Sequence, residues 1–232
     1  MAITPVVSKA RLDNTNPTQL VYSCPSTATY AIVDVTITKE DTSLDVTLRA
    51  AISTDTNASN LTSIDYFSDK IDINGSVTLA EINRLIIGPN QNLFISVVSA
   101  SASNYAVNVR VNGIQDTVLN KIVAAGRLAA STYAPNSINA LFDAASYTNV
   151  AYVTGALSIG NNSTNQALIE VWISDSTNTS NIPPQDKVLH TVIPSQDTVI
   201  LESIMTSNTE KIYVRSSVAN VEYFLNGMVM RS

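Results

Sequence analysis

The chain has 232 residues, of which 45% are hydrophobic and only 14% charged, with a formal net charge of −6. This length allows one large all-β domain or two domains of ordinary size. The 13 Lys and Arg residues are scattered singly, so no basic stripe is available to neutralise a nucleic-acid backbone, and we expect no nucleic-acid partner. Ser, Thr and Asn dominate the remaining residues, which favours β structure over helix.

The N-terminal segment, residues 1–10, is short, partly apolar and contains Pro5. We predict that it is an arm that lies across a neighbouring subunit and does not pair into the chain's own sheet. It lacks a long apolar core followed by a small-residue cleavage site, and no segment approaches the ~18 apolar residues of a membrane span. We therefore expect no membrane partner, and use or assembly in a cytoplasm.

Apolar and polar residues alternate along several segments. Val33, Val35 and Ile37 alternate with polar residues, and Val109 and Val111 follow the same pattern. This period of two is typical of antiparallel strands with one buried face. Polar stretches and prolines between the strand candidates predict turns. These turn signals are Asn74-Gly75, residues 55–60, 160–166 and 174–181, and Pro89, Pro183, Pro184 and Pro194.

The second half of the chain repeats the first in outline. Asn112-Gly113 late in the first half corresponds to Asn226-Gly227 late in the second, and we expect a bulge or kink of the closing strand at both places. The other matched blocks, in the same order, are Arg11-Leu12 with Arg127-Leu128, 27–38 with 144–159, 45–53 with 167–174, and 75–99 with 196–217. A repeat of this length is the size of a sandwich domain. We predict an all-β fold of two tandem antiparallel β-sandwich (jelly-roll-like) domains.

The predicted organisation has four parts: an N-terminal arm at 1–10, a first β-sandwich domain at 11–115, a linker at 116–126 and a second β-sandwich domain at 127–232. Two segments have a spacing that could be helical. For 78–86 we expect a strand followed by a short turn of helix, because its counterpart 198–205 is rich in β-branched residues. The second segment, 116–130, bridges the repeats and is interpreted as the linker with the first strand of domain two.

Residues that could support catalysis are few. Cys24 is the single cysteine and His190 the single histidine, so the chain has no intrachain disulfide and no cluster of Cys or His for a metal. A Ser-His-Asp triad would have to be built around His190, which lies in a plain strand pattern. No glycine-rich phosphate loop occurs. We predict no catalytic residue and no cofactor.

Two parts of the sequence contain residue types that are found in calcium or sugar sites. The densest acidic stretch contains Asp65, Asp69, Asp72 and Asn74. It lacks the spacing and the closing Glu of an EF-hand, so we expect a solvated loop there, not a calcium site. The aromatic residues of the second half that could form a sugar platform are Trp172, Tyr213, Tyr223 and Phe224. They lie on strand candidates, where aromatic side chains more often fill a core.

The segment 10–41 resembles the opening of a small β-sandwich structural module found in virion proteins of tailed phages, including cyanophages. The matching positions are Arg11, Thr15, Leu20 (one place early), Tyr22, Pro25 and 30–38, followed by 92–99 and 106–114. The second half departs from the pattern, because Pro135 precedes 139–146 without a Tyr-x-x-Pro. The resemblance implies a non-enzymatic structural role in an oligomer of the virion, with other virion proteins as partners.

We therefore expect a bacteriophage head-decoration or cement protein that binds the capsid exterior, with the major capsid protein as partner. A tail, neck, baseplate or fibre-attachment protein of the same fold is the first alternative. The second is a carbohydrate-binding module or glycan-active enzyme that uses Trp172 and neighbouring tyrosines.

Overall fold

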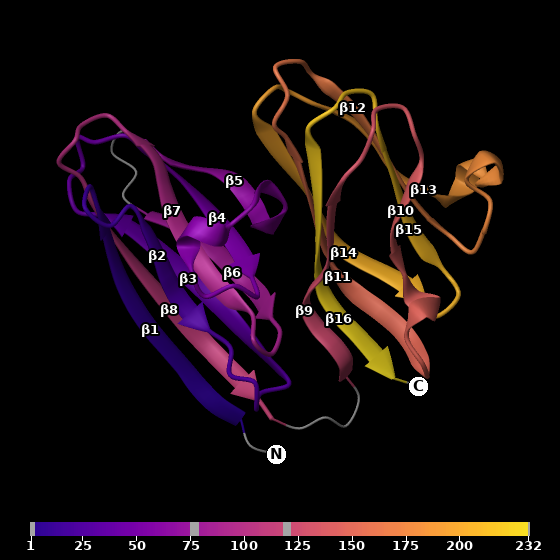
Figure 1. Cartoon of the computed structure of the whole chain (residues 1–232), viewed down its shortest axis with the longest axis horizontal. Coiled ribbons are helices and arrows are strands. Elements are labelled where there is room, and N and C mark those ends of the chain that lie inside the picture. Colours follow the sequence, from indigo (N-terminus) through magenta and orange to yellow (C-terminus); the bar gives the residue numbers. More distant parts are fainter. Residues whose placement is uncertain (1–2, 75–78, 118–121, 232) are drawn as a thin grey trace. The chain divides into compact units, whose positions relative to one another are not determined.

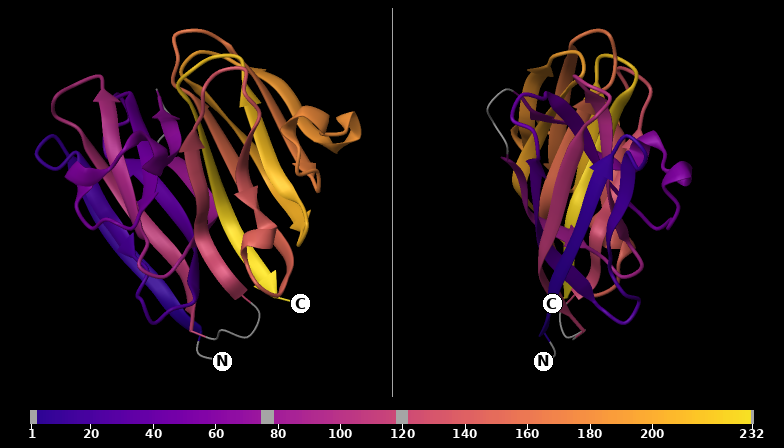
Figure 2. Two further views of the ribbon diagram at one scale, coloured as in Figure 1. Left: turned by 45° about the vertical axis from the view of Figure 1, so that its right-hand side comes forward. Right: turned by 90° about the vertical axis from the view of Figure 1, so that its left-hand side faces the viewer.

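The computed structural model describes residues 3–74, 79–117 and 122–231, and it divides the chain into two compact units, Met1–Val118 and Leu119–Ser232. Apart from short 3-10 turns, the regular structure of the described residues is β-strand (Figure 1). The two further views of Figure 2 show the same strands from other sides. The predicted all-β fold is confirmed.

Unit 1 contains eight strands in two four-stranded sheets. The strand orders are β1-β8-β3-β6 and β2-β7-β4-β5, and all pairings are antiparallel. The strands are β1 (Ile3–Asp13), β2 (Thr18–Ser23), β3 (Tyr30–Lys39), β4 (Val46–Ser53), β5 (Tyr66–Ile73), β6 (Leu79–Ile87), β7 (Asn92–Ala100) and β8 (Ala106–Asp116).

Unit 2 repeats this topology. Its sheets have the orders β14-β11-β16-β9 and β10-β15-β12-β13, which become those of unit 1 when eight is subtracted from each number. The strands are β9 (Ile122–Thr132), β10 (Asn139–Asp143), β11 (Val150–Asn161), β12 (Ala167–Ser174), β13 (Lys187–Ile193), β14 (Asp197–Ser207), β15 (Lys211–Ser216) and β16 (Val221–Arg231). Each unit is thus an eight-stranded double-sheet jelly roll, and the predicted pair of tandem sandwiches is confirmed.

The core of each unit lies between its two sheets. In β3 the alternation Ala31, Val33, Val35, Ile37 is fully buried, while Asp34 between them is exposed. In unit 2 the same role falls to Ile169 and Val171 of β12 and to Leu225 and Val229 of β16. Each such side chain stabilises the fold by roughly 1.5–3 kcal/mol through burial. The period of two in the sequence therefore marks the inward faces.

The bulge predicted at the Asn-Gly pairs is wrong for β8, but the pairing of β16 with β9 shifts register between Leu225 and Asn226, with the extra residue, Leu128, in β9. Val33 pairs with Gly113 and Gly155 with Gly227 without a shift of register at these pairs. A Cβ on Gly113 would lie 2.1 Å from the carbonyl oxygen of Ile32, and one on Gly227 would lie 2.3 Å from that of Thr154. Glycine is needed because two backbones approach closely, a recognised role of strand glycine.

Both units also have a bulge in the edge strand that lies two places from the closing strand. Arg84 in β6 and Ser203 in β14 have φ of 55° and 58°, and the register of each strand shifts there. The carboxylate of Asp34 accepts a hydrogen bond from the Arg84 N–H at 2.7 Å. The predicted helical turn after 78–86 is therefore wrong. The extra residue places inward side chains three apart, as in Ile82 and Leu85, and this imitates helical spacing.

The predicted N-terminal arm is also wrong. From Ile3 to Asp13, β1 pairs residue by residue with β8. Pro5 is compatible with this pairing because β1 is an edge strand. The predicted linker 116–126 is too long as well, since Asp116 still belongs to β8 and β9 begins at Ile122. Residues 118–121 lie outside the described part.

The register of the predicted repeat needs one correction. Arg127 pairs with Asn226, and the equivalent partner of Asn112 in unit 1 is Val7, not Arg11. The match of Arg11 with Arg127 is therefore off by four residues. The match of Ile52-Ser53 with Ile173-Ser174 holds, because both pairs end equivalent strands.

We predict that Gly113→Ala and Gly227→Ala each destabilise the protein by about 1–3 kcal/mol, because the added methyl group meets the backbone of the neighbouring strand. Urea unfolding followed by circular dichroism measures the change. The control is Asn112→Ala on the outer face of the same strand. Equal stability of Gly113→Ala and the control would show that the two backbones are not in close contact.

Candidate functional site

The two residues with reactive side chains do not form a catalytic group. Cys24 is buried, and burial raises the pKa of its thiol, so the thiol stays protonated. His190 lies in β13 on the outer face of its sheet, with its side chain about half exposed. Its Nδ1 lies 3.4 Å from Oε1 of Glu170. His190 is thus a strand residue beside an ion pair.

In the acidic stretch around Asp65, the described carboxylates Asp65 and Asp72 bind neighbouring groups of the chain. Asp65 is buried and its Oδ2 accepts hydrogen bonds from the N–H and hydroxyl of Thr62. Asp72 accepts the Thr47 hydroxyl at 2.7 Å and pairs with Lys70. Within the described residues, no group of three or more His, Cys, Asp or Glu side chains could hold a metal ion. In the same part of the chain, no helix has the length and apolar character to cross a membrane.

A cluster of charges occupies the outer face of the β10-β15-β12-β13 sheet. Glu170 of β12 has His190 of β13 opposite it on one side and Arg215 of β15 on the other. Lys187 donates to Glu170 Oε1 at 2.6 Å, and Arg215 pairs with Oε2. The Glu170 side chain is only 4% exposed, whereas Lys187, Arg215 and His190 are 29%, 38% and 56% exposed. We call these three residues around Glu170 the basic face.

The basic face carries an excess of positive charge. Burial alone would raise the pKa of Glu170, but the hydrogen bond from Lys187 and the charge of Arg215 outweigh it and hold that pKa below its usual range. Two permanent positive charges therefore surround one negative charge. In a chain with a net charge of −6, such a surplus is a local exception.

Trp172 lies beneath this cluster and is not an exposed sugar platform. Its ring is 5% exposed and lies 5.2 Å from Lys187 Nζ and 5.9 Å from the Arg215 guanidinium, measured to the ring centroid. Tyr213, opposite Trp172, is buried and donates its hydroxyl to the carbonyl of Ser176. The aromatic residues therefore support the cations and the adjacent loop, which removes Trp172 as a stacking surface.

The equivalent face of unit 1 has a different charge pattern. Arg49 of β4 is the equivalent of Glu170 of β12, because each lies three residues before the matched Ile-Ser pair. The partner of Arg49 on β7 is Ser96, whereas the partner of Glu170 on β15 is Arg215. The guanidinium of Arg49 lies 4.0 Å from the centroid of the Tyr66 ring. Beside Arg49, Lys70 of β5 pairs with Asp72, so the two cations of this face have separate partners in unit 1, whereas Lys187 and Arg215 share Glu170 in unit 2.

An acidic loop follows β3 in unit 1. Residues 40–45 expose Glu40, Asp41 and Asp45, and we call this segment the acidic loop. Beneath it the buried Lys39 ammonium group donates to the carbonyl oxygens of Leu44 and Ile73. These hydrogen bonds fix the loop from below.

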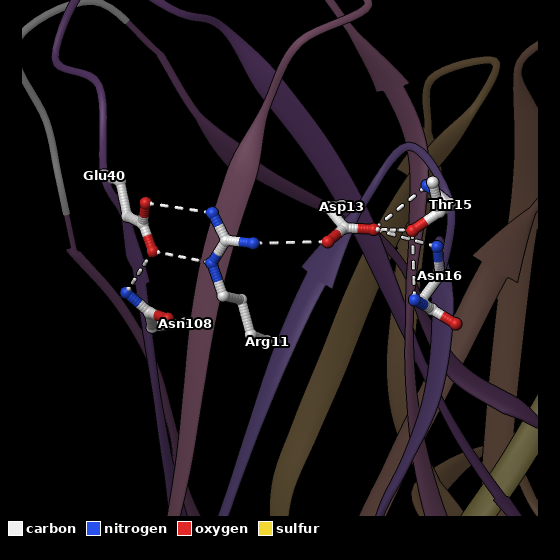
Figure 3. A network of polar contacts seen from close by, with 6 residues as sticks. All are labelled: Arg11, Asp13, Thr15, Asn16, Glu40 and Asn108. Atoms are coloured by element: carbon white, nitrogen blue, oxygen red, sulfur yellow. Dashed lines mark hydrogen bonds and ion pairs between the residues drawn. The ribbon is translucent and has the colours of Figure 1, made fainter.

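Polar contacts on the surface hold the same loop in place (Figure 3). Arg11 reaches Glu40 with two parallel hydrogen bonds of 3.0 and 3.2 Å, and Asn108 donates to the same carboxylate. Asp41 accepts the N–H and hydroxyl of Ser43, and these hydrogen bonds lower the pKa of Asp41, so it is ionised at neutral pH. The acidic loop is therefore both rigid and charged.

Unit 2 builds the equivalent loop without charge. Asn161, at the end of β11, takes the place of Lys39 and donates its amide to the carbonyls of Asn165, Ile193 and Pro194. Ser163 donates to Asn161 as Ser43 donates to Asp41. Residues 162–165 contain no charged side chain. The same scaffold thus carries carboxylates in unit 1 and amides and hydroxyls in unit 2.

A second pair of equivalent loops has a similar sequence, which could have been recognised from the sequence alone. Residues 53–60 and 174–181 share the pattern S-x-x-T-N-x-S-N. In both, the serine accepts from the backbone two residues on, and Asn57 or Asn178 caps a short 3-10 turn. These turns connect β4 to β5 and β12 to β13. The shared residues therefore give the two loops the same local conformation.

The edges of all four sheets carry features that discourage strand addition. Every pairing of an edge strand with its neighbour shows a shift of register except β1 with β8. In β1 it is Pro5 that removes a backbone donor. Bulges and edge prolines are recognised protections against edge-to-edge pairing. Contacts with other subunits are therefore expected at loops and sheet faces.

Comparison with known proteins gives weak likenesses only. No family model matches the sequence, and no curated protein is significantly similar to it. Among solved structures, Broad Bean Stain Virus gives a TM-score of 0.37 at 8% identity, covering 99% of this chain and 88% of that one. The STIV MCP gives 0.35 at 9% identity, covering 99% and 97%. PNGase F from Flavobacterium meningosepticum gives 0.36 at 11% identity, covering 100% and 96%. At these scores none of them bears on function.

We predict that Glu170→Gln destabilises the protein at pH 7 by about 2 kcal/mol, because Lys187 and Arg215 lose their shared carboxylate. The folded-state pKa of Glu170 is depressed, so its contribution is present above the unfolded-state pKa of about 4.3 and is lost as the pH falls through the lower folded-state value. Urea unfolding at pH 7 and at about pH 3 should show the gap to wild type closing.

The matched control is Glu202→Gln on the exposed part of β14, which should change stability little at either pH. A gap between wild type and Glu170→Gln that persists unchanged in acid would mean that the Glu170 carboxylate is not the stabilising group.

Proposed function

We propose that the chain is a non-enzymatic structural subunit of a virus particle, and within that class a head-decoration or cement protein on the capsid exterior. The observation that carries the proposal is the tandem pair of jelly rolls, a fold recurrent in viral capsid and lectin domains. A fold alone does not fix a function, so a capsid role and a sugar-binding role have to be distinguished by the residues on the surface.

The surface favours a structural role. Cys24 is buried, His190 contacts an ion pair, and the Trp172 ring lies under two cations. These are the residues on which an enzymatic or sugar-binding role of this chain would rest. Their positions therefore support neither alternative, and the resemblance of residues 10–41 to a phage virion module points the same way.

The loops favour docking on a fixed surface. Lys39, Asn161 and the capping residues Asn57 and Asn178 hold loops at equivalent places of both units. A loop that is ordered before binding loses less conformational entropy when it docks. Many copies of a modest contact can then coat a particle tightly. A tail, neck, baseplate or fibre-attachment protein would use the same properties, and position and copy number separate the two roles.

We predict that antibodies against the recombinant chain label the outside of the heads of particles whose genome encodes it, with a high copy number by quantitative mass spectrometry. Particles stripped of the protein serve as control and should regain the label when the chain is added back. Label at the tail with few copies would contradict decoration and favour the tail alternative. Absence from purified particles would contradict any virion role.

A further inference from the structure

The acidic loop of unit 1 and the basic face of unit 2 carry opposite charge, and the two units arrange their charged side chains differently at equivalent places. The loop that follows β3 in unit 1 carries carboxylates, and the equivalent loop after β11 in unit 2 carries none. On the outer face built on β4 and β12, Lys187 and Arg215 gather around the buried Glu170 in unit 2, whereas the cations of unit 1 have separate partners. One chain therefore presents an acidic loop on one unit and a basic face on the other.

Both surfaces are held rigidly. The buried Lys39 and the Glu40–Arg11 pair fix the acidic loop, and the shared carboxylate of Glu170 fixes Lys187 and Arg215. Charged groups that are already in place lose little entropy when they meet a partner. Oppositely charged surfaces of this kind set the orientation and partner choice of an interface.

The basic face also has an apolar border. Val188 and Val192 flank His190 on β13 and are 44% and 51% exposed. A stable interface needs an apolar centre in addition to ion pairs, because exposed ion pairs alone contribute little. The two valines supply such surface beside the cations.

We propose that the basic face of one copy binds the acidic loop of a second copy, so that chains associate head to tail. The contact is heterologous, since different surfaces of the two copies meet, and repetition of such a contact gives a ring or an open array. The edge strands do not compete with this contact because bulges and Pro5 block them. The inference deepens the proposed particle-subunit role and rests on it for its biological setting.

The first test is sedimentation equilibrium of the purified chain at low and high salt. We expect association with a dissociation constant at least tenfold weaker at about 0.5 M than at about 0.02 M salt, since screening removes the attraction between exposed charges. A chain that stays monomeric at low salt up to about 1 mM overturns the proposal. Because no particle is involved, failure here is distinct from absence of the chain from virions.

Two variants locate the contact while leaving Glu170 and Glu40 unchanged. Val188→Glu with Val192→Glu places negative charge on the basic face, and Asp41→Asn with Asp45→Asn removes charge from the acidic loop while keeping similar side-chain shapes. Each double variant should weaken self-association at least tenfold, or about 1.4 kcal/mol. Circular dichroism and urea unfolding confirm that each variant is folded.

The matched controls carry the same charge changes elsewhere. Val7→Glu with Val98→Glu replaces two exposed valines of unit 1, and Asp197→Asn with Glu202→Gln removes two exposed charges of unit 2. Both controls should associate within about twofold of wild type. Controls that weaken association as strongly as the test variants would show an effect of net charge alone and overturn the assigned contact.

A mixture of the two test variants gives the sharpest result. The first variant retains an intact acidic loop and the second an intact basic face, so one complementary contact remains between them. We expect each variant alone to be monomeric and the mixture to form dimers that contain one copy of each and do not grow further. Absence of this mixed dimer, with wild type associating, would overturn the pairing of these two surfaces.

Discussion

The structure depends on closing the edges of four short antiparallel sheets. A four-stranded sheet leaves a row of unpaired backbone groups on each side, and such rows attract further strands. Here a bulge or a proline interrupts each edge strand, and the equivalent bulges at Arg84 and Ser203 belong to both units. Because the edges are closed, other molecules meet loops and sheet faces. The loops and sheet faces that differ between the units are therefore the surfaces on which a partner would act.

The two units have the same strand topology and differ in the side chains on their loops and outer sheet faces. Gly113 and Gly227 allow the same close approach of strands, and Lys39 and Asn161 tie down the same loop with different chemistry. On the equivalent sheet faces, Arg49 lies where Glu170 gathers its cations. A duplicated frame with diverged side chains gives one chain two distinct surfaces, which is what the proposed contact between copies requires.

Much of the fold could be predicted from the sequence, because the alternation of Val33, Val35 and Ile37 reports directly on a buried face. The errors have physical causes. The bulge at Arg84 imitates helical spacing, and Pro5 argues against pairing only in a central strand, not in an edge strand such as β1. The basic face could not be predicted, because Glu170 and Arg215 are far apart in sequence and meet only through the pairing of β12 with β15. The repeated S-x-x-T-N-x-S-N loops could have been predicted as equivalent, because the pattern is continuous in the sequence.

The most direct measurement of how this chain makes contacts is amide hydrogen exchange, compared between the isolated chain at low concentration and the assembled form. We predict slower exchange on assembly in residues 40–45 and 187–192, where charge and exposed valines meet, with the edge strands β1 and β14 unchanged. New protection running along β1 or β14 would contradict this, because it would show that copies join by adding strands to the sheets.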